Sequence, residues 1–207
     1  MRIGAGRWKN ALLPAAGPAV RPVPGRLRTS LFSVLCPRLE GASVLDLCAG
    51  VGALGLEALS RGAARVVLVD RDRRAVDALS RWAAERGVTR EALAVVADAR
   101  RGGWPRGPYD IVFLDPPYDL WDVASDASSV LEQAVASTAP EGVIVVKGPA
   151  ARRLPEAPRW QTLTRRAQGT VSYTLLVPAP GRSAPPEGSP AGGASEGQEG
   201  HPPGRLK

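Results

Sequence analysis

Short apolar runs alternate with amphipathic segments through the middle of the chain. The run at residues 66–69 is almost entirely β-branched, which is typical of a strand buried on both faces of a parallel sheet. Further along, Val76, Leu79 and Trp82 recur at helical spacing. Strands that alternate with helices of this length predict βαβ units and a parallel sheet. We expect strands at 43–47, 66–69, 93–97, 110–114 and 143–146, and helices at 26–35, 52–60, 73–86 and 125–137.

The pattern changes toward the C-terminus. Residues 161–166 and 170–177 flank a glycine-containing turn, which predicts a β-hairpin and therefore an antiparallel end to a sheet of seven strands. From Pro178 onward, small and polar residues show no apolar periodicity, and we expect a disordered tail. The predicted fold is α/β, with a mostly parallel sheet and helices on both faces. Its expected parts are an N-terminal segment (1–40), a domain (41–177) and a tail (178–207).

The N-terminal segment has glycine, proline and arginine in irregular order, with one short helix that Pro37 would end. The predicted buried face of this helix consists of Leu27, Leu31, Val34 and Leu35. No acidic residue occurs among the first 39 residues, and the basic residues there are Arg2, Arg7, Lys9, Arg21, Arg26, Arg28 and Arg38. This segment carries the whole net charge of +7, because the rest of the chain is balanced. A basic arm on a neutral domain favours a polyanion such as RNA or DNA. An arginine-rich surface without a binding role explains the charge equally well.

Other residue types exclude several kinds of chemistry. Cys36 and Cys48 are the only cysteines, and we expect both to be small, buried or half-buried apolar residues in a reducing cytoplasm. His201 is the only histidine and lies in the predicted tail, which excludes histidine-dependent nucleophilic catalysis and histidine metal sites. Pro14 and Pro18 interrupt the apolar stretch near the N-terminus, so we expect neither a signal peptide nor a membrane span.

A glycine-rich loop follows the first predicted strand. Gly50, Gly52 and Gly55 fit the pattern G-x-G-x-x-G between a strand and a helix, where glycines let the backbone approach a ligand. Asp70 lies 20 residues after Gly50, at the end of the second strand, where its carboxylate could accept both hydroxyls of a ribose. Enzymes that use nicotinamide dinucleotides share this layout.

Two further acids distinguish a nicotinamide dinucleotide from S-adenosylmethionine as the expected cofactor. Asp46, at the tip of the first strand, would repel a pyrophosphate but could receive a cationic or amino-acid headgroup. Asp98 ends the third predicted strand, where it could accept from an adenine amino group, although a simple strand-end cap is an equal alternative. The pattern therefore favours S-adenosylmethionine.

The most specific motif stands at the end of the fourth predicted strand and consists of Asp115, Pro116, Pro117 and Tyr118. Ligands of open α/β sheets bind at the carboxyl ends of the strands. There, the Asp115 carboxylate and the Pro116 carbonyl could each accept one hydrogen of an –NH2 group, and Tyr118 could stack on a base. The prolines would fix this geometry. The motif indicates a methyltransferase that modifies an exocyclic amine.

With these motifs, the chain resembles the bacterial 16S (small-subunit) rRNA guanine-N2 methyltransferases of the RsmD type, which are class I S-adenosylmethionine-dependent enzymes with a Rossmann-like fold. The similar segments are 1–3, 6–9, 21–22, 26–32, 45–63, 113–118 and 169–175. The resemblance implies a catalytic set of Asp115, Pro116, Pro117 and Tyr118. It implies a cofactor-binding set of Asp46, Cys48, Ala49, Gly50, Gly52, Asp70, Arg71, Asp98 and Ala99. It implies an RNA-binding set of Arg2, Arg7, Lys9, Arg21, Arg26 and Arg28, no metal, and a monomer that acts on 16S rRNA or a small-subunit assembly intermediate.

Some positions depart from the family's pattern on the expected substrate side, namely Val23, Pro24, Gly25, Thr29 and Lys147. They leave three alternatives open. The target could be adenine N6 in RNA or DNA, because the acceptor edge suits any exocyclic amine. The chain could be an inactive rRNA-binding assembly factor. A nicotinamide-dependent dehydrogenase has only the glycine loop in its favour.

Overall fold

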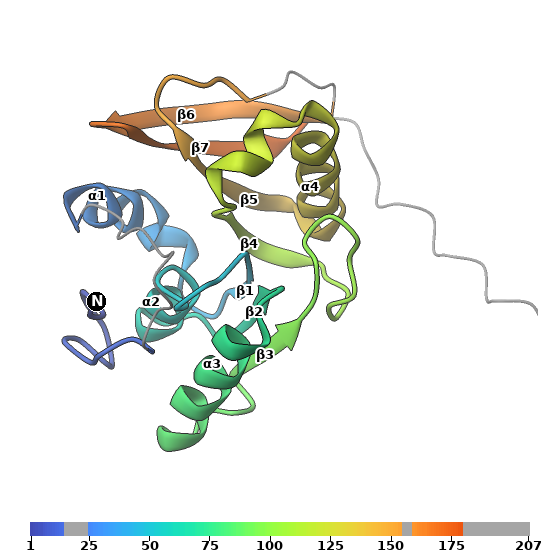
Figure 1. The fold of residues 1–207 in the computed structure, drawn as a ribbon. Coiled ribbons are helices and arrows are strands. Elements are labelled where there is room, and N and C mark those ends of the chain that lie inside the picture. Colours follow the sequence, from blue (N-terminus) through green and yellow to red (C-terminus); the bar gives the residue numbers. More distant parts are fainter. Residues whose placement is uncertain (15–24, 155–158, 180–207) are drawn as a thin grey trace, which may run out of the picture.

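A computed structural model describes residues 1–14, 25–154 and 159–179 of this chain, without the side chains of residues 118 and 119. The seven predicted strands form one sheet of order β3-β2-β1-β4-β5-β7-β6 (Figure 1). Strands β1 to β5 are parallel, and β7 runs antiparallel to both β5 and β6. The strands are β1 (Ser43–Leu47), β2 (Arg65–Asp70), β3 (Ala92–Val96), β4 (Tyr109–Leu114), β5 (Thr138–Pro149), β6 (Trp160–Gln168) and β7 (Val171–Pro178). The helices are α1 (Gly25–Leu35), η1 (Cys36–Arg38), α2 (Gly55–Ser60), α3 (Arg73–Glu85), η2 (Tyr118–Asp122) and α4 (Ala124–Ser137).

Helices cover both faces of the sheet, as predicted (Figure 1). On one face, residues of α1, α2 and α3 form an apolar cluster with strand residues such as Phe113. On the other face, Val130 and Leu131 of α4 pack with strand residues such as Val112. Successive strand residues point to opposite faces, so one strand supplies both clusters.

The buried face of α1 differs from the prediction at one position. Phe32 is fully buried and lies 6.0 Å from Phe113 between ring centroids, whereas Val34 is 37% exposed. The buried stripe is centred on Leu31 and Leu35, and Val34 lies at its border, where it lines a shallow groove beside the β6–β7 hairpin. Helix α1 therefore contributes side chains to the main apolar core.

Several other boundaries differ from expectation, and three of them have a structural reason or consequence. Helix α2 begins at Gly55, because Gly50 and Gly52 take positive φ angles of 54° and 73° that no α-helix accommodates. Strand β5 is longer than predicted, since its final residues pair with β7. Strand β7 includes Pro178, the first residue of the predicted tail, opposite Trp160. Residues 180–207, the rest of that tail, lie outside the described residues.

The two cysteines have different environments. Cys48 is half-buried, as expected, but Cys36 is exposed. The prediction for Cys36 is wrong because this residue begins the short η1 helix at the surface, after Leu35 has ended the buried face of α1. Across the described ranges, no helix is long and apolar enough to cross a membrane, and no group of His, Cys, Asp and Glu side chains is arranged to hold a metal ion.

Candidate functional site

Asp46 lies at the end of β1 and is almost fully buried, with 1% of its surface exposed. Its Oδ2 atom accepts a hydrogen bond of 2.8 Å from the N–H of Gly55, the first residue of α2. Burial raises the pKa of Asp46 to about 8, in spite of this hydrogen bond. The carboxyl thus stands between the strand end and the helix N-terminus.

The loop after β1 is tightly packed against the domain's own core. A Cβ atom on Gly52 would lie 2.7 Å from Leu79 and 2.9 Å from Leu56, and φ at Gly52 is positive. Cys48 has a φ of 63°, an uncommon conformation for a residue with a side chain. Burial also raises the pKa of the Cys48 thiol. At Gly52 the glycine is therefore required by packing inside the protein as well as by the turn.

Asp70 connects the end of β2 to this loop. Its Oδ2 accepts from the Gly50 N–H at 2.8 Å, and its Oδ1 accepts from the Asp72 N–H at 2.9 Å. The carboxylate keeps lone pairs for further donors, because each oxygen can accept more than one hydrogen bond. The structure thus places Asp46, Asp70 and the loop residues Cys48, Ala49, Gly50 and Gly52 together, and their role in binding a cofactor stays a prediction.

Asp98 lies two residues beyond the end of β3 rather than at it, because β3 ends at Val96. Its carboxylate is bound by the Arg100 guanidinium, with 2.7 Å between Oδ2 and Nη2, and accepts from the Arg100 backbone N–H at 3.0 Å. The hydrogen bonds to Arg100 lower the pKa of Asp98 to about 2. Arg100 also pairs with Asp126 of α4 at 3.0 Å. These contacts fit the strand-end alternative, and a role at the adenine remains a prediction for Asp98 and its neighbour Ala99.

Asp115 follows β4 directly, and its carboxylate is paired with Lys147. The Lys147 Nζ atom lies 2.7 Å from both carboxylate oxygens. The side chain of Lys147 is 9% exposed and that of Asp115 is 22% exposed. Burial raises the pKa of Asp115, and the ammonium of Lys147 opposes this rise. The candidate acceptor is therefore one half of a largely buried ion pair.

Sequence reasoning missed this partner, although a signal was present. It singled out Lys147 only as a position at the end of the fifth strand that departs from the family's pattern. Parallel strands β4 and β5 align Leu114 with Val146, so the next residues, Asp115 and Lys147, lie side by side. A charged residue directly after an apolar strand at the ligand-binding edge could have indicated the pairing.

The remaining residues of the Asp-Pro-Pro-Tyr motif lead from β4 into η2. Pro116 is buried and Pro117 is exposed, with an extended backbone at φ −59° and ψ 150°. Tyr118 begins η2, and its side chain lies outside the described part of the structure, so its stacking role stays a prediction.

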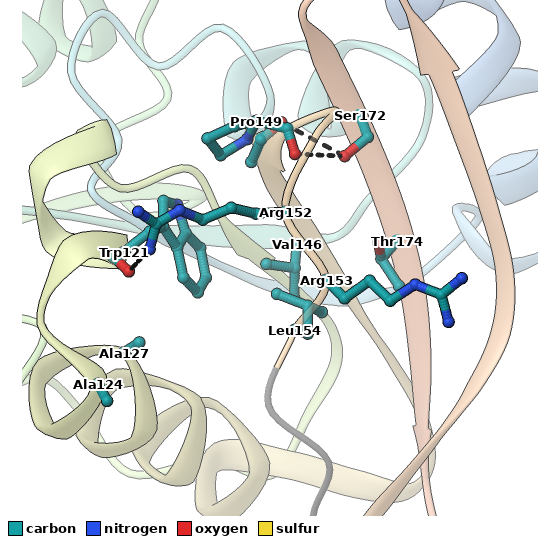
Figure 2. A pocket seen from close by; sticks show the side chains of 11 residues that line it. Trp121, Ala124, Ala127, Val146, Pro149, Arg152, Arg153, Leu154, Ser172 and Thr174 are labelled. Carbon is teal, nitrogen blue, oxygen red and sulfur yellow. Dashed lines mark hydrogen bonds between the residues drawn. The ribbon is translucent and has the colours of Figure 1, made fainter.

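A pocket of about 210 Å³ lies next to η2, on the α4 face of the sheet (Figure 2). Trp121 and Leu154 supply apolar walls, and Arg153 reaches past the β7 side chain Thr174. Arg152 is held by the Trp121 carbonyl and the Asp122 carboxylate. Sequence reasoning did not anticipate this pocket, because its walls come from segments far apart in the chain.

The basic N-terminal segment packs against α2 and α3. Buried Glu57 of α2 accepts from the backbone N–H groups of Gly4 and Ala5 at 2.6 and 3.1 Å, and it pairs with Arg61 at 2.7 Å. Trp8 packs edge-on against Trp82, with 5.5 Å between the ring centroids. Residues 1–14 are therefore attached to the domain at several points.

The predicted RNA-binding residues have different surroundings. Arg2 donates to the Asn10 carbonyl at 2.7 Å, and Arg28 donates to the Arg2 carbonyl at 2.9 Å. Arg7 stacks over the ring of Trp8 at 4.8 Å. Arg2, Arg7, Lys9 and Arg26 are exposed, and Arg28 is partly buried. Arg21, Val23 and Pro24 lie outside the described residues.

The strand order, the antiparallel β7 and the acids at the carboxyl ends of β1, β2 and β4 define a class I methyltransferase fold. The chain belongs to the family described as Conserved hypothetical protein 95, which matches residues 1–177. It is 34% identical over 183 residues to ribosomal RNA small subunit methyltransferase D of Escherichia coli (strain K12), which covers 84% of this chain and 88% of that protein. The protein of the same name from Haemophilus influenzae is 31% identical over 180 residues, which cover 84% of this chain and 92% of that protein.

Solved structures give the same result. A putative methyltransferase from Escherichia coli superposes with a TM-score of 0.72 at 32% identity, covering 86% of this chain and 98% of that one. A putative methylase from Haemophilus influenzae has a TM-score of 0.69 at 27% identity, with the same coverage. The resemblance seen in the sequence is thereby confirmed at the level of family and fold.

Proposed function

We propose that this protein transfers a methyl group from S-adenosylmethionine to the exocyclic N2 amine of a guanine in 16S rRNA. The observation that carries the proposal is the Asp115 carboxylate at the carboxyl end of β4, paired with Lys147, beside the acid-bearing loops after β1 and β2. The relatives named ribosomal RNA small subunit methyltransferase D support the substrate class.

The donor set of the loops fits this cofactor. Asp46 and Asp70 present carboxyl groups at adjacent strand ends, and the like charge of Asp70 adds to the rise in the pKa of Asp46 that burial causes. A cationic amino-acid headgroup is attracted there, whereas the pyrophosphate of a nicotinamide dinucleotide is repelled. When bound, S-adenosylmethionine supplies a methyl group on a positively charged sulfonium, which leaves readily. The chain itself then has only to bind, orient and exclude water.

Asp115 and Pro116 orient the target amine. Each accepts one of the two amine hydrogens, one through the Asp115 carboxylate and one through the Pro116 carbonyl, so that the nitrogen lone pair faces the cofactor side. The hydrogen bond to the Asp115 carboxylate is charge-assisted and therefore short and strong, which helps to fix the amine in place. Tyr118 stacks on the base and the two prolines keep the loop stiff. After transfer, the surplus proton passes to Asp115 or to water.

Two measurements test the proposal. Calorimetry with S-adenosylmethionine tests the cofactor site, and transfer to free 16S rRNA and to unmodified small-subunit particles tests the substrate. Nucleoside analysis should show N2-methylguanosine. Asp115→Asn should lower the rate at least about a hundredfold, the typical cost of losing one positioned electrostatic contact, with unchanged cofactor affinity.

The alternatives give different results. Methylated adenine N6 would move the target to adenine. RNA binding without transfer, insensitive to Asp115→Asn, would identify an assembly factor. Affinity for NAD with none for S-adenosylmethionine would identify a dehydrogenase.

A further inference from the structure

Lys147 occupies an unusual place for a charged residue. It follows the buried apolar residues Val145 and Val146 of β5 and is itself 7% exposed. The register of β4 and β5 sets it beside Asp115, and its ammonium contacts both carboxylate oxygens at 2.7 Å. An ammonium centred on both oxygens limits rotation of the carboxylate about its own bond.

The charged groups around this pair are mostly acids. Asp115 and Asp70 both raise the pKa of Asp46 by like charge, and Lys147 is the cation that lowers the pKa of both Asp46 and Asp115. On β7, Tyr173 is the register partner of Lys147 and is fully buried on the same face. Lys147 therefore supplies the positive charge that offsets the acids at this edge of the sheet.

We propose that Lys147 is a positioning residue, whose ammonium keeps Asp115 ionised and fixes the plane of its carboxylate, so that the remaining lone pairs accept a hydrogen of the target amine. The last step of this inference rests on the proposed function, whereas the ion pair and its effect on Asp115 do not.

The physical reason lies in what Asp115 would do alone. A carboxyl group removed from water takes up a proton, since desolvation disfavours its charged form. A protonated carboxyl carries an O–H donor, which would oppose the donating N–H groups of an amine. The ammonium of Lys147 opposes this protonation, because it favours the charged carboxylate. As an ammonium it has no acceptor of its own, so it acts through Asp115 and does not bind the amine.

The first test measures the pKa of the Asp115 carboxyl directly. Carbon-13 NMR of aspartate carboxyls, with Asp115→Asn to assign the signal, gives the pKa of Asp115 in each variant. Lys147→Met should raise that pKa by at least one unit, and Lys147→Arg, which keeps the charge, should change it little. Arg90→Met removes an exposed cation elsewhere and should leave the pKa of Asp115 unchanged.

The second test follows methyl transfer in single turnovers across pH. In Lys147→Met the acid limb of the rate profile should move to higher pH, with the rate falling about tenfold per pH unit below it, as for one protonating group. The rate should recover at alkaline pH, and cofactor affinity should stay near that of the unaltered protein. Lys147→Arg should restore most of the neutral-pH rate.

Either of two results would overturn the inference: an unchanged pKa of Asp115 in Lys147→Met, or a rate reduced by the same factor at every pH. Because Lys147→Met leaves a buried carboxylate without its partner, it can also destabilise the fold. The double variant Lys147→Met, Asp115→Asn removes both charges and controls for folding.

If the unaltered protein methylates no RNA, the proposed function fails, while the carboxyl titration still decides the role of Lys147.

Discussion

Acidic residues at neighbouring strand ends have different partners and therefore different charge states. Asp46 accepts from the helix N-terminus of α2, and burial raises its pKa to about 8. Asp98 is bound by Arg100, which lowers its pKa to about 2. Asp115 is ion-paired with Lys147. Groups whose environments push their pKa values apart are typical of sites that bind or transform a ligand.

The raised pKa of Asp46 predicts that cofactor binding depends on pH. A cationic cofactor favours the ionised carboxyl. Affinity for S-adenosylmethionine should therefore rise as pH increases toward about 8 and then level off. Below that pH, binding should release a proton. Calorimetry in buffers of different ionisation enthalpy measures this release.

A matched variant and the stability of the free protein complete this test. Asp46→Asn should abolish both the proton release and the pH dependence, and an unchanged proton count in that variant would assign the effect elsewhere. Because its folded pKa is raised above the unfolded value near 3.8, Asp46 stabilises the free protein most at low pH. That contribution is lost as pH rises toward about 8.

The strand-end acids could be predicted from the sequence, but their partners could not. Asp46, Asp70 and Asp115 were identified because apolar strands run directly into them, and a parallel sheet gathers such ends at one edge. The pairing of Asp115 with Lys147 depends on the register between β4 and β5, which the apolar pattern of either strand alone does not fix. The binding of Asp98 by Arg100 depends on a side-chain conformation, for which the sequence has no periodic signal.

Helices and strands, too, could be predicted where the sequence has a periodic pattern and could not where the structure depends on contacts between distant segments. Periodicity located β1 and α3 nearly to the residue because each has a clear pattern of burial. It placed the start of α2 too early, since positive φ angles in the loop delay the helix. It also gave no indication that residues 1–14 dock on α2, because backbone N–H groups make those contacts with Glu57 and Ser60, and any residue type can supply them.

The docking of the N-terminal segment predicts that Gly6 cannot be replaced. A Cβ atom there would lie 1.8 Å from the Ser60 carbonyl oxygen, at a φ of 82°. Gly6→Ala must displace the segment and should cost about 2–4 kcal/mol of unfolding free energy, measured by urea denaturation. Gly41→Ala is the matched control, because Gly41 has a similar φ of 72° with no atom within 4 Å of the added carbon. It should cost only about 1–2 kcal/mol of backbone strain. Equal losses would show that the clash at Gly6 is relieved without cost.

For the molecule as a whole, the order of the sheet predicts where the chain can be shortened. Strand β7 lies between β5 and β6, and its last pairing is Pro178 with Trp160. Removal of residues 180–207 should leave the melting temperature and methyl transfer unchanged, as expected for a tail without apolar periodicity. Removal of residues 169–207 deletes β7 and should abolish folding, which circular dichroism measures. A loss of activity in the shorter deletion would give the tail a function.

The charge distribution predicts how the protein as a whole binds RNA. Lys9 and Arg26 are exposed members of the basic N-terminal set. Each phosphate contact to single-stranded RNA contributes about 0.7 to the slope of log affinity against log salt concentration. Changing both residues to Gln should therefore lower the magnitude of that slope by about 1.4, without altering cofactor affinity. Arg90 and Arg106 are exposed outside this set and form the matched control pair. If their replacement lowers the slope equally, the N-terminal charge is a general surface property and no RNA-binding site lies there.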